Sequence, residues 1–205
     1  MQDVRDLKAL QIDALREVAN IGAGHAATAL SLMTERRVMI SVPRINIARL
    51  EEVPDLLGSS QEVVAAVLMH MLGDLTGRTL LMFPDTVARK LCDMLLRRPA
   101  GTTQAFDILE QSCLKEAGNI LSGAYMNALS DFMGMLLLPS VPSLVVDLLG
   151  AVLTTAYLNF GHERDFVFCV ETALYIDSEG GFRGHFLLLP DLASLRAIFD
   201  AIRLT

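Results

Sequence analysis

The sequence predicts an α+β protein in which two helix–strands–helix units, related by a pseudo-two-fold axis, share a mainly antiparallel sheet with long helices packed on it. Residues 13–43 align with 112–142 without a gap and with 11 identities in 31 positions. Each aligned segment starts with a helical pattern and runs into β-rich sequence. Each half then reaches a Pro-Asp pair followed by an amphipathic segment. An internal duplication is the simplest explanation of these three observations.

A long helix is predicted at the start of each half. Residues 5–34 carry apolar side chains at the spacing of one helix face, namely Leu7, Leu10, Ala14, Val18 and Ile21. The equivalent positions of the second half predict a helix over 104–131, namely Phe106, Leu109, Cys113, Ala117 and Ile120. Gly24 and Gly123 fall inside these helices, where glycine costs about 1 kcal/mol relative to alanine. We expect close packing against a helix or the sheet to compensate.

Strands are predicted after each helix. The first half offers a strand over 39–47 and a hairpin of 63–71 with 78–83, across a glycine-bounded turn at 73–77. The second half offers four strands, at 136–146, 151–159, 166–176 and 184–189. A turn at 177–181 joins the last two.

Each half is predicted to close with a helix that begins beside Pro-Asp. Asp85 and Asp191 are placed to cap these helices. The segment 97–103 is the predicted junction between the halves. We therefore expect one domain over 1–205, made of a first repeat at 1–99 and a second at 100–205.

Charge and hydropathy exclude several classes of function. A net charge of −7 disfavours binding to nucleic acid and to anionic membrane surfaces. The most apolar stretch, 132–160, is interrupted by Pro139, Pro142 and Asp147. A strand–turn–strand pair explains this stretch better than a membrane-spanning helix, so we predict no membrane insertion. An apolar fraction of 52% indicates a large core or a surface that a partner covers.

The cysteines and histidines indicate neither a disulfide framework nor a metal site. Cys92, Cys113 and Cys169 are odd in number and widely separated, which is typical of buried thiols in a reducing cytoplasm. The four histidines have no ligand-like spacing. We predict a cytoplasmic protein with no metal and no cofactor of its own.

The same polar spacing occurs on both predicted helices. Asp13, Glu17 and Asn20 stand at positions i, i+4 and i+7, which places them in one narrow stripe along a helix. The second helix repeats the spacing with Ser112, Glu116 and Asn119. Each stripe lies about 100° from the apolar stripe. We therefore expect two exposed sites, each at the edge of a buried helix face.

An exposed glutamate is usually a solvated charge, and a helical asparagine can bond to the backbone or mark a kink. Because the glutamate and the asparagine are both present in two diverged copies, a functional explanation is favoured. The sequence shows no nucleophile–base pair, no glycosidase-like carboxylate pair and no P-loop. A carboxamide is neutral and can hold a water molecule without deprotonating it. That suffices for phosphoryl transfer, which depends mainly on positioning and charge stabilisation.

The motif Asp/Ser-x-x-x-Glu-x-x-Asn, followed at a distance by Pro43 or Pro142, resembles that of the CheC/CheX/FliY family of chemotaxis proteins, over essentially the whole chain. The resemblance implies a phosphatase whose substrate is the aspartyl phosphate of the response regulator CheY. Its asparagines, Asn20 and Asn119, would orient water for in-line attack.

The resemblance also implies the roles of the remaining site residues and the partners. Glu17 or Glu116 would pair with a lysine of the regulator, and Asp13 and Ser112 would be supporting residues. The Mg²⁺ ion would belong to CheY. The receptor deamidase CheD is the second implied partner.

Two other functions stay open at this point. The chain could be a non-catalytic adaptor that binds phosphorylated CheY or CheD. It could also be a structural part of the flagellar switch, although we expect such a chain to carry an additional switch-domain segment. Because its two halves can replace the dimer of a half-length relative, we expect a monomer.

Overall fold

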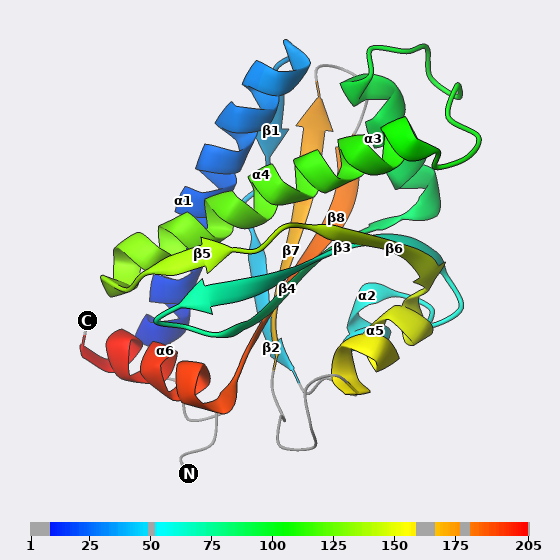
Figure 1. Ribbon diagram of the computed structural model, residues 1–205. Helices are drawn as coiled ribbons and strands as arrows, with labels where there is room; N and C mark the ends of the chain where they lie inside the picture. The colour runs from blue at the N-terminus through cyan, green and yellow to red at the C-terminus, as the bar shows by residue number, and fades with distance from the viewer. Residues whose placement is uncertain (1–8, 49–51, 159–166, 177–180, 205) are drawn as a thin grey trace.

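Helices cover both faces of one eight-stranded sheet (Figure 1). The computed structural model describes residues 9–48, 52–158, 167–176 and 181–204. One face carries the larger core, beneath α1 (Ala9–Thr34), α3 (Asp85–Leu95), α4 (Ile108–Met133) and α6 (Leu192–Leu204). The opposite face carries a smaller core, beneath α2 (Val53–Leu57) and α5 (Leu149–Leu158).

The described strand pairs are all antiparallel, which confirms the predicted sheet type. The strands are β1 (Val38–Ile40), β2 (Arg44–Ala48), β3 (Val63–Gly73), β4 (Gly77–Pro84), β5 (Leu137–Pro139), β6 (Ser143–Leu148), β7 (Val167–Ile176) and β8 (Gly181–Pro190). Their order is β1-β7-β8-β4-β3-β5, with β2 also on β7 and β6 also on β3. The two hairpins, β3–β4 and β7–β8, meet along β4 and β8 at the centre.

Each half contributes its two short strands to the hairpin of the other half. β1 and β2 pair with β7, whereas β5 and β6 pair with β3. Val38 faces Ile176, and Leu137 faces Gly73. Adding 99 to Val38 gives Leu137, and adding 103 to Gly73 gives Ile176, so the two ladders have the same register. This equivalence confirms the predicted pseudo-two-fold relation between the halves.

A repeated Ser-Val-Pro segment interrupts the outer strands. Ser41 donates its amide to the Ala173 carbonyl (2.8 Å), and its hydroxyl accepts the Ala173 amide (3.0 Å). Ser140 makes the same two bonds with His70, at 3.0 and 2.9 Å. The proline that ends each segment has no amide hydrogen to donate to the ladder. The single strands predicted over 39–47 and 136–146 are therefore wrong, because each is two short strands on either side of this segment.

The strand predicted over 151–159 is also wrong, because α5 occupies this region and residue 159 lies outside the described residues. Leu149, Val152, Leu153 and Ala156 are buried on the sheet, at the spacing of a helix face. The apolar stretch 132–160 is thus not a strand–turn–strand pair. Helix α2 was not predicted either, since five residues are too few to show a helical period. None of the described helices is both long enough and apolar enough to cross a membrane.

The strands of both hairpins are confirmed within a few residues. The turn predicted at 177–181 and position 166 lie largely outside the described residues.

Of the two predicted helix caps, one is confirmed and one is wrong. Asp191 Oδ1 accepts the Ser194 amide at 2.8 Å, so it caps α6 as predicted. The cap predicted for Asp85 is wrong: its carboxylate binds Arg89 Nε at 2.7 Å, and Pro84 occupies the cap position of α3.

The buried faces of the long helices are rotated from their predicted positions. Ile21 and Leu109 were expected inside but are 44% and 53% exposed, while Leu7 lies outside the described residues. The buried face of α1 is formed instead by Leu15, Val18, Ala19, Gly22, Ala23, Ala26 and Leu30. Small residues dominate this face because α1 packs against α4 as well as the sheet. A pattern based on large apolar residues misses such a face.

Glycines in the two long helices fall into two kinds. A Cβ at Gly22 would lie 2.8 Å from Tyr125 Cδ1 of α4, and one at Gly118 would lie 2.5 Å from Val67 Cγ1 of β3. These glycines allow close approach of a helix and of the sheet. A Cβ at Gly24 or Gly123 would meet nothing within 4 Å. The close packing predicted for these last two glycines is therefore wrong.

The two glycines of α4 give a matched prediction for stability. Gly118→Ala is expected to destabilise the protein by about 1–3 kcal/mol, because the new methyl group overlaps Val67. Gly123→Ala is expected to stabilise it by about 1 kcal/mol, because it removes a helical glycine without a clash. Urea unfolding of both variants measures the difference. Equal effects of the two substitutions would contradict the described contacts of α4.

The junction between the halves is organised by Asp93, a buried residue of α3. Its carboxylate accepts the amides of Gly101 (2.7 Å), Thr102 (3.1 Å) and Thr103 (2.7 Å). Burial alone would raise the pKa of this carboxyl group, but the hydrogen bonds from Thr103, Gly101 and Thr102 outweigh burial and lower it. Asp93 therefore acts as an anionic anchor that fixes the chain between α3 and α4.

Candidate functional site

The first polar stripe lies on the open surface of α1. Asp13, Glu17 and Asn20 are all exposed, as predicted. Asp13 Oδ1 binds Arg16 Nη1 at 2.9 Å in an exposed ion pair. Such a pair contributes little to stability. It ties Asp13 to the next turn of its own helix, whereas Glu17 and Asn20 remain directed outward.

The second polar stripe repeats this arrangement on α4. Ser112 and Glu116 are exposed, and Asn119 is half-buried. Among the residues that the structure describes, neither Asn20 nor Asn119 has a hydrogen-bond partner for its side-chain amide. The two donors and the acceptor of each amide are thus available to a ligand or a water molecule.

The two stripes point away from the contact between α1 and α4. Gly22 of α1 meets Tyr125 of α4. At about 100° per residue, the first stripe projects at roughly 160–220° from Gly22 around the helix axis. The second projects at roughly 120–180° from Tyr125. The predicted location at the edge of the buried face is therefore wrong for α1, whose stripe lies opposite the buried face.

Each asparagine has an apolar neighbour that is identical in the two halves. Ile21 follows Asn20 and is 44% exposed, and Ile120 follows Asn119 and is half-buried. Both isoleucines are predicted on the buried face, which is wrong for Ile21, whereas Ile120 packs against the larger core. Ile21 therefore places an exposed apolar side chain beside the first stripe. The identity of Ile21 with Ile120 in the repeat was the available signal for this position.

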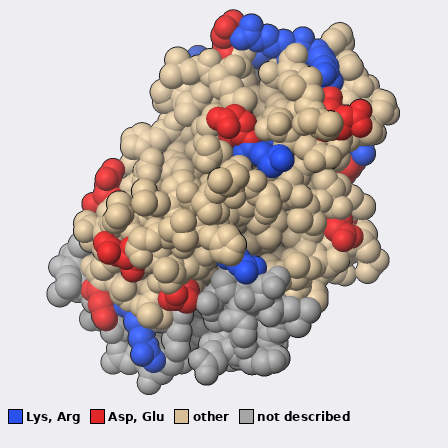
Figure 2. All heavy atoms as spheres, viewed as in Figure 1, with Lys and Arg blue, Asp and Glu red and all other residues tan. Residues whose placement is uncertain are grey.

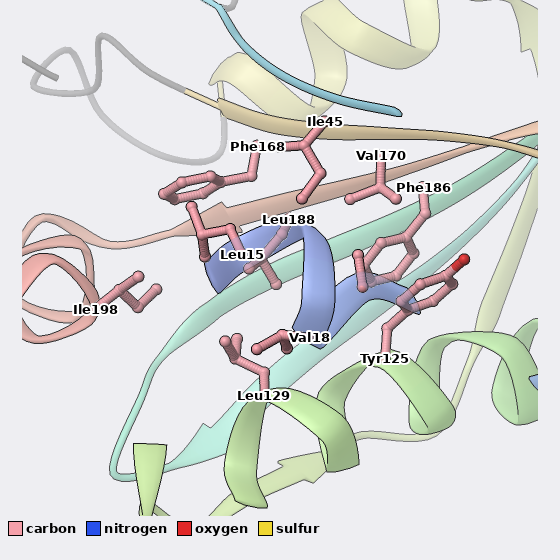
Figure 3. Close-up of a pocket in the computed structure, with 11 residues that line it drawn as sticks. Leu15, Val18, Ile45, Tyr125, Leu129, Phe168, Val170, Phe186, Leu188 and Ile198 are labelled. Atoms are coloured by element: carbon pink, nitrogen blue, oxygen red, sulfur yellow. The ribbon is translucent and has the colours of Figure 1, made fainter. Parts of the chain in front are cut away.

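An apolar cavity of about 50 Å³ lies beneath α1, between that helix, α4, α6 and the sheet (Figure 3). Leu15 and Val18 line it from the side of α1 opposite Glu17. Among the described residues that line it, the Tyr125 hydroxyl oxygen is the only polar side-chain atom. Such a cavity lacks the convergent polar groups that would orient a reacting molecule. The exposed helix surfaces are therefore the stronger candidate for chemistry.

A second hollow lies beside α3 and the junction, where arginines form ion pairs. Arg89 binds Asp85, and Arg98 Nη1 binds Glu110 Oε1 at 2.5 Å. The first pair lies within α3, whereas the second joins the segment after α3 to the start of α4. Together they account for two of the four basic side chains that the described lining of the hollow contains. On the face shown in Figure 2, acidic and basic side chains are otherwise scattered among uncharged ones.

The described part of the chain shows no group of three His, Cys, Asp or Glu side chains that could hold a metal ion. The absence of a metal or cofactor of its own stays a prediction. All three cysteines are buried, as predicted. Burial raises the pKa of the Cys169 thiol to about 12, which makes it unreactive as a nucleophile.

Comparison with known proteins agrees with the duplicated motif. The model of the CheC-like family matches residues 10–47 and again 109–146, two segments 99 residues apart that each contain one polar stripe. The CheY-P phosphatase CheC of Bacillus subtilis (strain 168) is 33% identical over 96% of this chain and 95% of its own. The chain belongs to the CheC-like family.

Solved structures show that the CheC-like fold is shared more widely. FliY of Thermotoga maritima has a TM-score of 0.79 at 19% identity, covering 97% of this chain and 98% of its own. The middle domain of FliM from Vibro alginolyticus has a TM-score of 0.65 at 15% identity, covering 93% and 99%. At these identities the likeness concerns the fold alone and shows nothing about function.

Proposed function

We propose that this chain is a phosphatase that removes the phosphoryl group from the aspartyl phosphate of a CheY-type response regulator. The observation that carries the proposal is the pair of exposed Glu-x-x-Asn sites, whose amides have no partner among the described residues. The Bacillus subtilis relative, which matches almost end to end, is itself named a CheY-P phosphatase. The fold presents each site on a rigid helix that can enter the active site of another protein.

The proposed reaction needs a positioned water molecule rather than a strong base. The amide of Asn20 or Asn119 accepts and donates hydrogen bonds, and so holds a water in line with the phosphorus–oxygen bond. The water oxygen bonds to phosphorus while the bond to the aspartyl oxygen breaks. The regulator's carboxylate leaves with the electron pair, and the water proton passes to phosphate or solvent. The Mg²⁺ that neutralises the phosphate charge is part of the phosphorylated substrate.

Glu17 and Glu116 have a docking role in this proposal. Each carboxylate lies one turn before its asparagine, on the same stripe. Pairing with a lysine of the regulator would fix the register in which the asparagine enters. Asp13 and Ser112 lie one turn further back and support the helix surface. CheD as a second partner, a monomeric state and a cytoplasmic location are likewise proposed.

The test is turnover of phosphorylated CheY. A small amount of this protein is added to an excess of phosphorylated regulator, and inorganic phosphate is followed over time. The phosphatase proposal predicts that each molecule releases many phosphates, at a rate proportional to its concentration. A non-catalytic adaptor would bind the regulator without raising phosphate release. The absence of any acceleration would therefore favour the adaptor.

A further inference from the structure

The polar stripes continue into one more residue that is identical in both halves. Gly24 follows Asn20 by four residues and Gly123 follows Asn119 by four, so each glycine lies on the stripe one turn beyond its asparagine. Gly24 is exposed and Gly123 is half-buried. Neither position has a neighbour that a side chain would touch.

Nothing in the described part of the chain explains these two glycines. A helical glycine costs about 1 kcal/mol relative to alanine, and the protein carries this cost twice. Gly22 and Gly118, in the same helices, are explained by Tyr125 and Val67. Neither Gly24 nor Gly123 has a positive φ angle, and both lie well inside continuous helices. Packing and backbone geometry therefore leave both of them unexplained.

We propose that Gly24 and Gly123 are specificity-determining contact positions, where the main chain of the phosphorylated regulator packs directly on the helix beside the asparagine. This inference rests on the proposed function. Without a Cβ, the partner's backbone can come into van der Waals contact with the backbone of the helix. That approach allows the short asparagine side chain to reach a phosphate recessed in another protein. A methyl group there would overlap the partner's main chain and weaken docking.

The inference predicts opposite effects on stability and on activity. Gly24→Ala and Gly123→Ala should each raise the unfolding midpoint, because alanine is the better helix former and its methyl group meets no described neighbour. The double variant should nevertheless dephosphorylate CheY about five- to tenfold more slowly at low regulator concentration, which corresponds to a mildly overpacked contact. Because the methyl group opposes docking, the loss should fall mainly on KM.

Two backgrounds provide matched controls. With Asn119→Ala present, only the first site works, and adding Gly24→Ala should lower the rate. With Asn20→Ala present, the first site is already inactive, and adding Gly24→Ala should leave the rate unchanged. A second readout is affinity for CheY carrying beryllium fluoride in place of the phosphoryl group. Both glycine substitutions together should weaken this binding about five- to tenfold.

The results separate this inference from the proposed function. If Gly24→Ala and Gly123→Ala together raise stability but change neither the rate nor the affinity, the glycine inference is overturned while the phosphatase stands. If the native protein does not accelerate phosphate release, the phosphatase proposal fails. The affinity measurement then decides the glycine inference alone, because an unchanged affinity overturns it and a weakened one supports it.

Discussion

Replacing Asn20 and Asn119 together with alanine is expected to abolish the acceleration of phosphate release from CheY. Each amide is proposed to hold the attacking water in line, and loss of such positioning lowers a rate on the order of 100-fold. The helices should remain intact, since alanine is a better helix former than asparagine by about 0.6 kcal/mol. Phosphate release by the double variant, measured beside its unfolding curve, tests this prediction.

Two single variants and a surface control test whether each asparagine acts independently. Because the two sites point away from each other, Asn20→Ala and Asn119→Ala should each keep the activity of the remaining site, and the two residual rates should add up to the native rate. Asn46→Ala changes an exposed asparagine on β2 and should leave the rate unchanged. Native activity in the double variant would show that the asparagines do not carry the reaction.

Replacing Asp93 with alanine is expected to destabilise the protein by about 3 kcal/mol. Three amides, those of Gly101, Thr102 and Thr103, would lose their acceptor, and unsatisfied buried donors are costly. Asp107→Ala is the control, because Asp107 is exposed and makes no side-chain capping bond to α4. That variant should remain within about 0.5 kcal/mol of the native protein. Urea unfolding at neutral pH measures both.

Asp93 also predicts a pH dependence of stability. Its folded-state pKa is lowered by hydrogen bonds that outweigh burial, so the unfolded chain takes up the proton first as the pH falls. The stabilisation is complete above the ordinary aspartate pKa of about 3.9 and is lost as the pH drops through the folded-state value. The difference in unfolding free energy between the native protein and Asp93→Ala should therefore shrink in acid. A constant difference would contradict the anionic anchor.

The fold class was predictable because the repeat is visible in the residues themselves. The identity of Leu15 with Leu114 and of Pro43 with Pro142 fixed the equivalence of the halves, and the glycine-bounded turn at 73–77 fixed one hairpin. The exchange of β1 and β2 with β5 and β6 was not predictable. It depends on which edge each short strand joins, and hydropathy is the same on either edge. The region of α5 was predicted as a strand for a related reason, since a helix buried on a sheet is as apolar as a strand.

The exposed positions of the candidate site could be predicted from the sequence more accurately than the buried positions around them. Glu17 and Asn20 could be placed on the surface because their spacing is polar and repeated. The helix rotation was misjudged because Ala19, Gly22 and Ala26 form the buried face, and small residues contribute little to an apolar pattern. Ile21 was consequently assigned to the interior. The meaning of Gly24 required the structure, because only the open space around it distinguishes it from Gly22.

Asn20 and Asn119 are proposed to act in the chemical step and not only in docking. The most direct test is the rate of phosphate loss from a small amount of phosphorylated CheY held in a saturating excess of this protein, so that weaker docking cannot limit the rate. Rapid loss is expected with the native chain, and only the spontaneous rate with the Asn20→Ala, Asn119→Ala variant, although that variant still binds the regulator. A native rate at saturation with that variant would contradict a role in the chemical step.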